Sequence, residues 1–160
     1  MPRLVGKGEK RHGKRSGNAR RRTLARKEAG HIRARHVARV RAVCHGIYFS
    51  FNPEFFATAC EEEEIASNDF AKSLFLGACE HIEEIDAKIN ENLRSWSLSR
   101  VSRVSLAVMR ICAYELMFTD IPVSIAINEA LEVDKKFDKD DAPSFINGVL
   151  NAIAKGCVRE

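Results

Sequence analysis

The residues that most resemble a chemical site lie near the N-terminus, where the segment from Gly8 to Arg15 is similar to a phosphate-binding loop. Gly8, Gly13 and Lys14 have the required spacing, but Arg15 stands where the loop needs Ser or Thr to hold magnesium. Such a loop also follows a strand and opens a helix, and the surrounding sequence predicts neither element. We therefore expect no nucleotide hydrolysis at this segment.

Other groups of reactive residue types are also better explained without catalysis. The acidic run Glu61–Glu64 has no histidine beside it and is typical of a solvated helix end or a docking surface for a basic partner. Cys79, Glu80 and His81 are metal-ligand types, but adjacent residues on a helix point in different directions. No GxSxG nucleophile motif occurs. The sequence predicts no enzymatic activity, no cofactor and no metal site.

Cysteine usage and hydropathy indicate the compartment. The five cysteines form no CxxC pair, and their odd number and wide spacing favour free thiols. Cys44 and Cys112 lie among Val, Ile and Ala, so we expect both in the core. No stretch approaches the roughly 20 apolar residues of a membrane-spanning helix, and the N-terminus lacks the apolar region of a signal peptide. We expect a cytoplasmic protein.

The strongest physical signal is a concentration of arginine in the N-terminal quarter of the chain. Residues 1–41 hold 15 Lys and Arg and 2 Glu, a net charge of +13, whereas residues 42–160 carry a net charge of −9. Such clusters bind phosphates, and arginine-rich segments often fold on RNA. The alternative is a merely solvated tail. The candidate RNA-binding residues are Arg20, Arg21, Arg22, Arg33, Arg35, Arg39 and Arg41.

The elements that position these residues are predicted to be helices. Residues 1–30 combine high charge with few large apolar side chains, so we expect a disordered basic extension before a helical domain at 31–160. Apolar residues then recur at three- and four-residue steps, and no segment alternates with period two. The sequence predicts an all-α fold of about seven helices, at about 31–51, 53–65, 68–89, 97–101, 104–119, 122–137 and 141–156.

Local signals mark several of these helix ends. Asn68 is the predicted N-cap of the third helix, and Ser102 or Ser105 that of the fifth. Trp96 is expected to anchor the short turn that follows it. Gly156 is a predicted stop for the last helix, because glycine adopts the backbone conformation that ends helices.

A series of motifs in the C-terminal half resembles a known family. The motifs are Trp96–Arg100 (WSLSR), Val108–Leu116 (VMRICAYEL), Ile121–Ala130 (IPVSIAINEA) and Phe145–Leu150 (FINGVL). Their order and spacing are similar to those of the NusB family, and Arg39–Tyr48 resembles its first helix more loosely. The chain departs from the family pattern where it carries Val40, His45, Ser105 and Asp138 in place of Arg, Gln, an acidic residue and Gly.

The resemblance implies a fold of two packed three-helix units that acts without cofactors. It also implies a transcription antitermination factor that binds single-stranded boxA-type RNA together with NusE, a small-subunit ribosomal protein. The RNA polymerase antitermination complex so formed would promote transcription of ribosomal RNA operons. By position, the resemblance places the arginine-rich first helix and Phe145 against RNA, and Tyr48 and Asp141 near the RNA and partner surfaces. Ordinary core packing is the alternative for Phe145 and Tyr48.

Two rival functions share the same resemblance. A NusB-like domain forms the RNA-binding part of certain ribosomal RNA cytosine methyltransferases, but those chains continue into a large α/β catalytic domain, which we do not expect here. The second rival is an RNA-binding factor for ribosome assembly or ribosomal RNA processing, without a role in transcription. The sequence does not separate that reading from antitermination.

Overall fold

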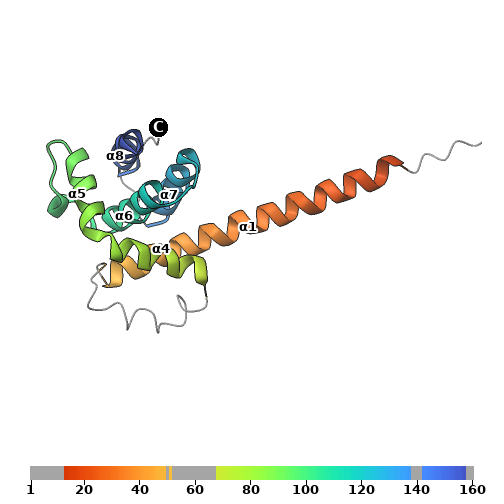
Figure 1. The fold of residues 1–160 in the computed structure, drawn as a ribbon, viewed down its shortest axis with the longest axis horizontal. Helices are drawn as coiled ribbons and strands as arrows, with labels where there is room; N and C mark the ends of the chain where they lie inside the picture. Colours follow the sequence, from red (N-terminus) through yellow and green to blue (C-terminus); the bar gives the residue numbers. More distant parts are fainter. Residues whose placement is uncertain (1–12, 50, 52–67, 138–141, 158–160) are drawn as a thin grey trace, which may run out of the picture. The chain divides into compact units, whose positions relative to one another are not determined.

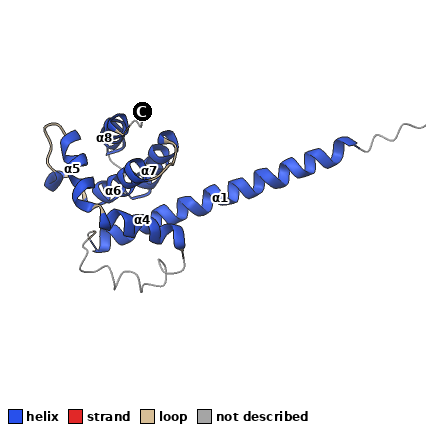
Figure 2. Ribbon diagram, viewed as in Figure 1, coloured by secondary structure: helices blue, strands red, loops and turns tan. Residues whose placement is uncertain are grey.

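The structure is a computed structural model, and it describes residues 13–49, 51, 68–137 and 142–157. Within these residues the fold is entirely helical, which confirms the predicted all-α class (Figures 1 and 2). The elements are α1 (Gly13–Phe49), α4 (Asp69–Glu80), α5 (Ile82–Asn92), the 3-10 turn η2 (Leu98–Arg100), α6 (Arg103–Phe118), α7 (Val123–Phe137) and α8 (Ala142–Gly156). The predicted helix at 53–65 lies outside the described residues.

The chain divides into two compact units, Met1–Ala34 and Arg35–Glu160. The first unit contains the basic extension predicted at residues 1–30, and within it α1 begins at Gly13. Residues 13–34 contain no proline and are rich in Ala, Arg and Lys, which are strong helix formers. Their intrinsic propensity therefore favours a helix although every residue from 20 to 34 is exposed and buries nothing. Residues 1–12 lie outside the described residues.

The third predicted helix is divided in the structure. Asn68 caps α4 as expected, since its side chain accepts a hydrogen bond from the backbone N–H of Ala71 at 2.9 Å. The chain then leaves helical geometry at His81 (φ −110°, ψ 20°), and α5 begins at the next residue. The ring of His81 stacks on that of Phe118, with centroids 4.0 Å apart. This contact between distant parts of the sequence is invisible to helical periodicity, which predicts one continuous helix.

The elements after α5 follow the prediction closely. The short turn appears as η2, and α6, α7 and α8 begin and end within a residue or two of the expected positions. Ser102, one of the two predicted caps, accepts a hydrogen bond from the backbone N–H of Ser105 at 3.1 Å. Gly156 ends α8. Caps and apolar periodicity are local signals, and the ends of these helices in the structure agree with them.

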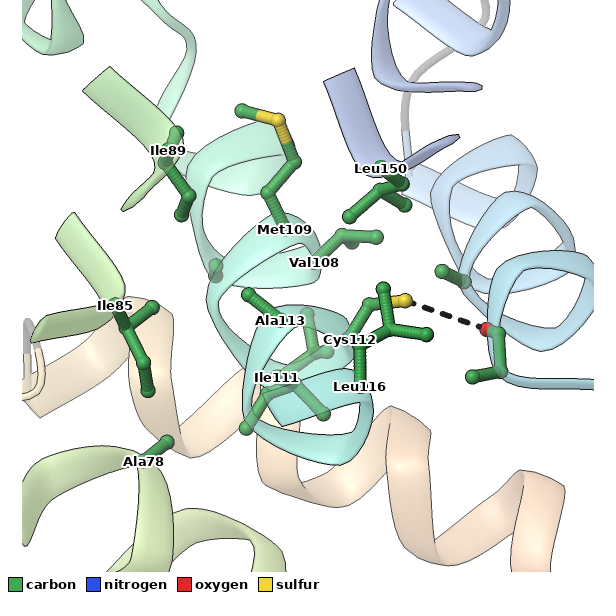
Figure 3. Close-up of a cluster of buried hydrophobic side chains, with 14 of the residues drawn as sticks. Ala78, Ile85, Ile89, Val108, Met109, Ile111, Cys112, Ala113, Leu116 and Leu150 are labelled. Atoms are coloured by element: carbon green, nitrogen blue, oxygen red, sulfur yellow. Dashed lines mark hydrogen bonds between the residues drawn. The ribbon is translucent and has the colours of Figure 1, made fainter. Parts of the chain in front are cut away.

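Helix α6 is the centre of the second unit and packs against α4, α5, α7 and α8. In Figure 3 the side chains Val108 and Met109 of α6 lie near Ile89 of α5 and Leu150 of α8, whereas the Cys112 thiol donates to the backbone carbonyl of Ala126 in α7 at 3.5 Å. Burial raises the pKa of the Cys112 thiol well above its usual range, so this thiol stays protonated and packs as a small apolar group. Cys112 thus meets the expectation of a core cysteine.

Cys44 does not meet that expectation, because it is exposed. Ala42 and Val43 of α1 are the buried residues beside it, and a helix turns by about 100° per residue. Cys44 therefore faces away from the core although its neighbours in sequence are apolar. None of the described helices is long and apolar enough to cross a membrane.

Candidate nucleic-acid interface

The arginines of the first unit are available for contact with a ligand. Arg20, Arg21, Arg22 and Arg33 are all exposed, as predicted for residues that bind phosphates. At about 100° per residue, Arg22, Arg26 and Arg33 lie within about 40° of one another around the helix axis. One face of this helix therefore presents three guanidinium groups, and Arg20 and Arg21 lie about 140° and 120° away from that face around the axis.

In the second unit the candidate arginines of α1 have three different environments. Arg35 is exposed, and its guanidinium carbon lies 5.2 Å from the centre of the Phe70 ring. This cation–π contact orients the guanidinium and leaves it accessible. Arg41 is half-buried. Arg39 is buried, with only 4% of its surface exposed.

The structure corrects the role expected for Arg39. Its Nε donates to both carboxylate oxygens of Glu115 at 3.1 Å, and its Nη2 donates to Oε1 at 2.7 Å. The carboxylate of Glu129 lies 3.9 Å from its Nη1. This guanidinium binds the interior of the protein and does not face RNA. From sequence, Arg39 is indistinguishable from its exposed neighbours, since Glu115 lies 76 residues away.

The electrostatics of this pair reflect its burial. Burial raises the pKa of the Glu115 carboxyl above its ordinary value, and the hydrogen bonds and charge of Arg39 act against that rise. Nearby, Nδ1 of His36 lies 2.6 Å from the carboxylate of Glu129. The two contacts tie α1 to α6 and α7, and so fix the direction in which Arg35 projects.

Phe145 lies at the edge of the core, and its contact with RNA stays a prediction. Its ring is half-buried and packs against the hydrophobic cluster. On its other side the ring contacts Trp96, with centroids 5.8 Å apart and planes tilted by 51°. The two rings border a groove of about 520 Å³, which is lined by Glu91, Asn92, Leu93, Arg94, Ser95, Trp96, Ser144, Phe145, Gly148, Val149 and Ala152.

Two predicted contact residues cannot be placed. The side chain of Tyr48 and all of Asp141 lie outside the described residues. Their roles near the RNA and partner surfaces remain predictions.

The sequence interpretation missed a group of exposed basic residues close to Trp96 in the sequence. It assigned Trp96 to anchoring a turn, but 54% of this side chain is exposed. Arg94, Arg100 and Arg103 are exposed nearby in sequence. One signal could have found them: no Asp or Glu occurs between positions 92 and 114. A short acid-free stretch is easily overlooked beside the +13 of residues 1–41.

Comparisons with known proteins agree with the resemblance. The model of the NusB family matches residues 49–155. The transcription antitermination protein NusB of Nitratiruptor sp. is 42% identical over 129 residues, which cover 76% of this chain and 91% of that protein. A structure of NusB from T. maritima superposes with a TM-score of 0.66 at 30% identity, covering 76% of this chain and 90% of the other.

A further solved structure contains partners. It is described as the antitermination factors NusB and NusE in complex with dsRNA, and it matches with a TM-score of 0.64 at 32% identity. The match covers 78% of this chain and 98% of that one.

Proposed function

The chain belongs to the NusB family, and on that premise we propose that it is a transcription antitermination factor. In this role it binds boxA-type RNA together with NusE, as part of an RNA polymerase complex that promotes transcription of ribosomal RNA operons. It acts in the cytoplasm as a binding protein, without catalysis of its own.

The observation that carries the RNA part of this proposal is the exposure of the arginines of α1. Every residue from 20 to 35 is exposed, and the arginines among them include Arg20, Arg21, Arg22, Arg26, Arg33 and Arg35. Guanidinium groups bind phosphate oxygens through two parallel hydrogen bonds, and their release of counterions drives association with RNA. The first unit buries no side chain of residues 20–34, so its sequence is better explained by a ligand than by the stability of the fold.

Phe145 supports recognition of bases rather than of phosphates alone. Its half-buried ring lies at the border of an open groove, beside the exposed ring of Trp96. Aromatic rings at such positions stack on unpaired bases, whereas contacts to phosphates carry no sequence information. The body of the protein therefore supplies specificity, and the basic helix supplies most of the affinity.

The test is binding to a boxA-type RNA with and without NusE. We expect the single-stranded RNA to bind more tightly than its scrambled counterpart and more tightly than a duplex of the same sequence. NusE should raise the affinity further, because partners that share an RNA add their contacts. Equal binding of all three RNAs, with no effect of NusE, would contradict the proposal.

A role in ribosome assembly or ribosomal RNA processing is the alternative function. It needs the same RNA-binding surface but no contact with the transcription machinery. A pull-down from growing cells separates the two: RNA polymerase recovered together with NusE supports antitermination. Recovery of pre-ribosomal particles without polymerase supports the alternative.

A further inference from the structure

The groove beside Trp96 is an open concave surface that carries an exposed aromatic ring. Its walls come from the end of α5 and the chain up to Trp96 on one side, and from α8 on the other. At about 520 Å³ it is in the size range of small-ligand sites. Gly148 lies on the α8 wall, and a Cβ added there would meet nothing within 4 Å. The wall is therefore open at this residue.

Trp96 is held in place although 54% of the residue is exposed. Its backbone N–H donates to the carbonyl of Leu93 at 3.0 Å, which closes a tight turn at the end of α5. Arg94, inside that turn, has a positive φ of 55°, an unusual conformation for a residue with a side chain. The ring of Phe145 then supports the Trp96 ring from the α8 side. The indole is thus positioned before any ligand arrives.

The geometry of the two rings restricts how a ligand could bind. A planar ligand inserted between two rings needs about 7 Å between them, twice the stacking distance, and parallel planes. Here the centroids are 5.8 Å apart and the planes are tilted by 51°. No room exists for insertion, so a planar ligand must stack on the outer face of Trp96. Phe145 acts as the support of that ring.

The charge around the groove favours an anionic ligand. Arg94 lines the groove, and Arg100 and Arg103 follow within ten residues of it. No carboxylate of the described residues lies within ion-pair distance of these three arginines. The one acidic residue of the lining, Glu91, is 3.3 Å from the ammonium of Lys88. An exposed aromatic ring that lines the same groove as the guanidinium group of Arg94 suits a planar base attached to a phosphate.

We propose that this groove is a subsite for one unpaired nucleobase of the bound RNA, which stacks on Trp96 while Arg94 contacts its phosphate. This inference deepens the proposed function and rests on it, because it identifies Trp96 and Arg94 as contact residues that the family motifs do not assign. A segment of a partner protein is the competing occupant. Arg94 in the lining, and the pairing of the lining carboxylate Glu91 with Lys88, favour RNA over a basic ribosomal protein.

Because Trp96 is the only tryptophan of the chain, its fluorescence reports on this groove alone. The experiment titrates the full-length protein with a single-stranded boxA-type RNA, and separately with inorganic polyphosphate, which carries charge but no bases. Stacking of a base quenches indole emission, so the RNA should quench it and polyphosphate should not. Binding of each is measured in parallel by a method that does not depend on tryptophan.

Variants then link the signal to affinity. Trp96→Ala should weaken binding of the RNA about tenfold, since one stacked base contributes about that factor, whereas Trp96→Phe should retain most of the affinity. Gly148→Met leaves the indole in place but fills the groove, and should reproduce the loss. Phe137→Ala removes another exposed ring, 41% exposed at the end of α7, and serves as the matched control with unchanged affinity.

Single abasic substitutions along the RNA complete the test. At one position the abasic substitution should weaken binding of the RNA to the wild-type protein but should not weaken its binding to Trp96→Ala. That position identifies the stacked base. RNA that binds tightly without quenching, or that binds Trp96→Ala as well as wild type, overturns the subsite and leaves the proposed function standing. Quenching by NusE without RNA, together with weaker binding of NusE to Trp96→Ala in the tryptophan-independent assay, overturns it in favour of a protein site. If no RNA binds at all, both proposals fail.

Discussion

Arg39 of α1 and Glu115 of α6 form a bidentate ion pair in the interior, with 4% and 3% of their side chains exposed. A buried pair of this kind adds little net stability relative to apolar residues, but removal of one partner leaves a buried charge without compensation. The pair therefore favours one specific arrangement of α1 against α6. It also removes Arg39 from the set of arginines that can bind RNA.

The first prediction concerns the stability of Arg39→Ala. At neutral pH this variant should lose about 3–5 kcal/mol of the free energy of unfolding, because Glu115 stays buried and ionised without its partner. Without Arg39, the pKa of Glu115 rises further above its unfolded value. A raised carboxyl pKa contributes stability below the unfolded pKa that is lost as pH rises through the folded pKa. The penalty of the variant should therefore shrink from pH 7 toward pH 5, as measured by urea unfolding.

Two control variants test whether the loss of stability comes from the unpaired Glu115. Arg33→Ala removes an exposed arginine of the same helix and should change stability by less than about 0.5 kcal/mol. Arg39→Met combined with Glu115→Leu replaces both charges by apolar groups and should cost less than Arg39→Ala alone. A penalty for Arg39→Ala that does not change with pH would show that Glu115 is not the origin of the loss.

The second prediction separates charge from stability in the first unit. Replacement of Arg20, Arg21 and Arg22 by Gln keeps good helix formers but removes three charges. Each phosphate contact on a single strand contributes about 0.7 to the slope of log K against log salt, so the slope should flatten by about 2. The midpoint of thermal unfolding should not change, because these side chains are exposed. An unchanged slope would mean that these arginines do not contact RNA.

Local signals predicted the fold well where local forces decide it. Asn68 and Ser102 cap the helices that their types and positions indicate, and the apolar stripe of α6 is buried as its periodicity requires. Sequence reasoning was inaccurate where the local structure depends on a contact with a residue far away in the sequence. His81 interrupts a predicted helix and stacks on Phe118, and Arg39 is buried by Glu115, 76 residues away.

In the candidate site too, some features follow from the sequence and others depend on tertiary contacts. The excess of arginine along α1 is a property of composition, and the sequence reveals it directly. Which of those arginines is exposed depends on the rotation of the helix against the core, and this separates Arg35 from Arg39. The exposure of Trp96 depends on the turn that ends α5 and on the position of α8, neither of which follows from its own neighbours in sequence.

The third prediction concerns the double role of Phe145. Phe145→Leu keeps an apolar side chain at the edge of the core, so most of the stability should remain. It removes the ring beside Trp96, and affinity should fall more for a boxA-type RNA than for a scrambled one. Filter binding with both RNAs, beside thermal unfolding, tests this. Equal losses for the two RNAs would assign Phe145 to packing alone.

The last prediction addresses the close approach of α4 to α6 at Gly77. A Cβ added to Gly77 would clash with Cζ and the hydroxyl oxygen of Tyr114, so the phenol ring would have to move. That ring stacks on Phe118 at 5.7 Å and on His81 at 6.3 Å, which limits where it can go. Gly77→Ala should therefore cost about 1–3 kcal/mol of unfolding free energy, although alanine favours helices over glycine by about 1 kcal/mol.

The origin of that cost can be isolated, because the same clash cannot occur once the ring is gone. In a Tyr114→Ala background, Gly77→Ala should be neutral or stabilising, since only the helix propensity remains. Gly148→Ala is the matched control in the same fold: a Cβ there meets nothing within 4 Å, so this change should raise stability by up to about 1 kcal/mol. Urea unfolding of the single and double variants measures the coupling between positions 77 and 114. Additive effects of the two substitutions would show that α4 and α6 can separate freely, and that the absence of a side chain at Gly77 is not what sets their distance.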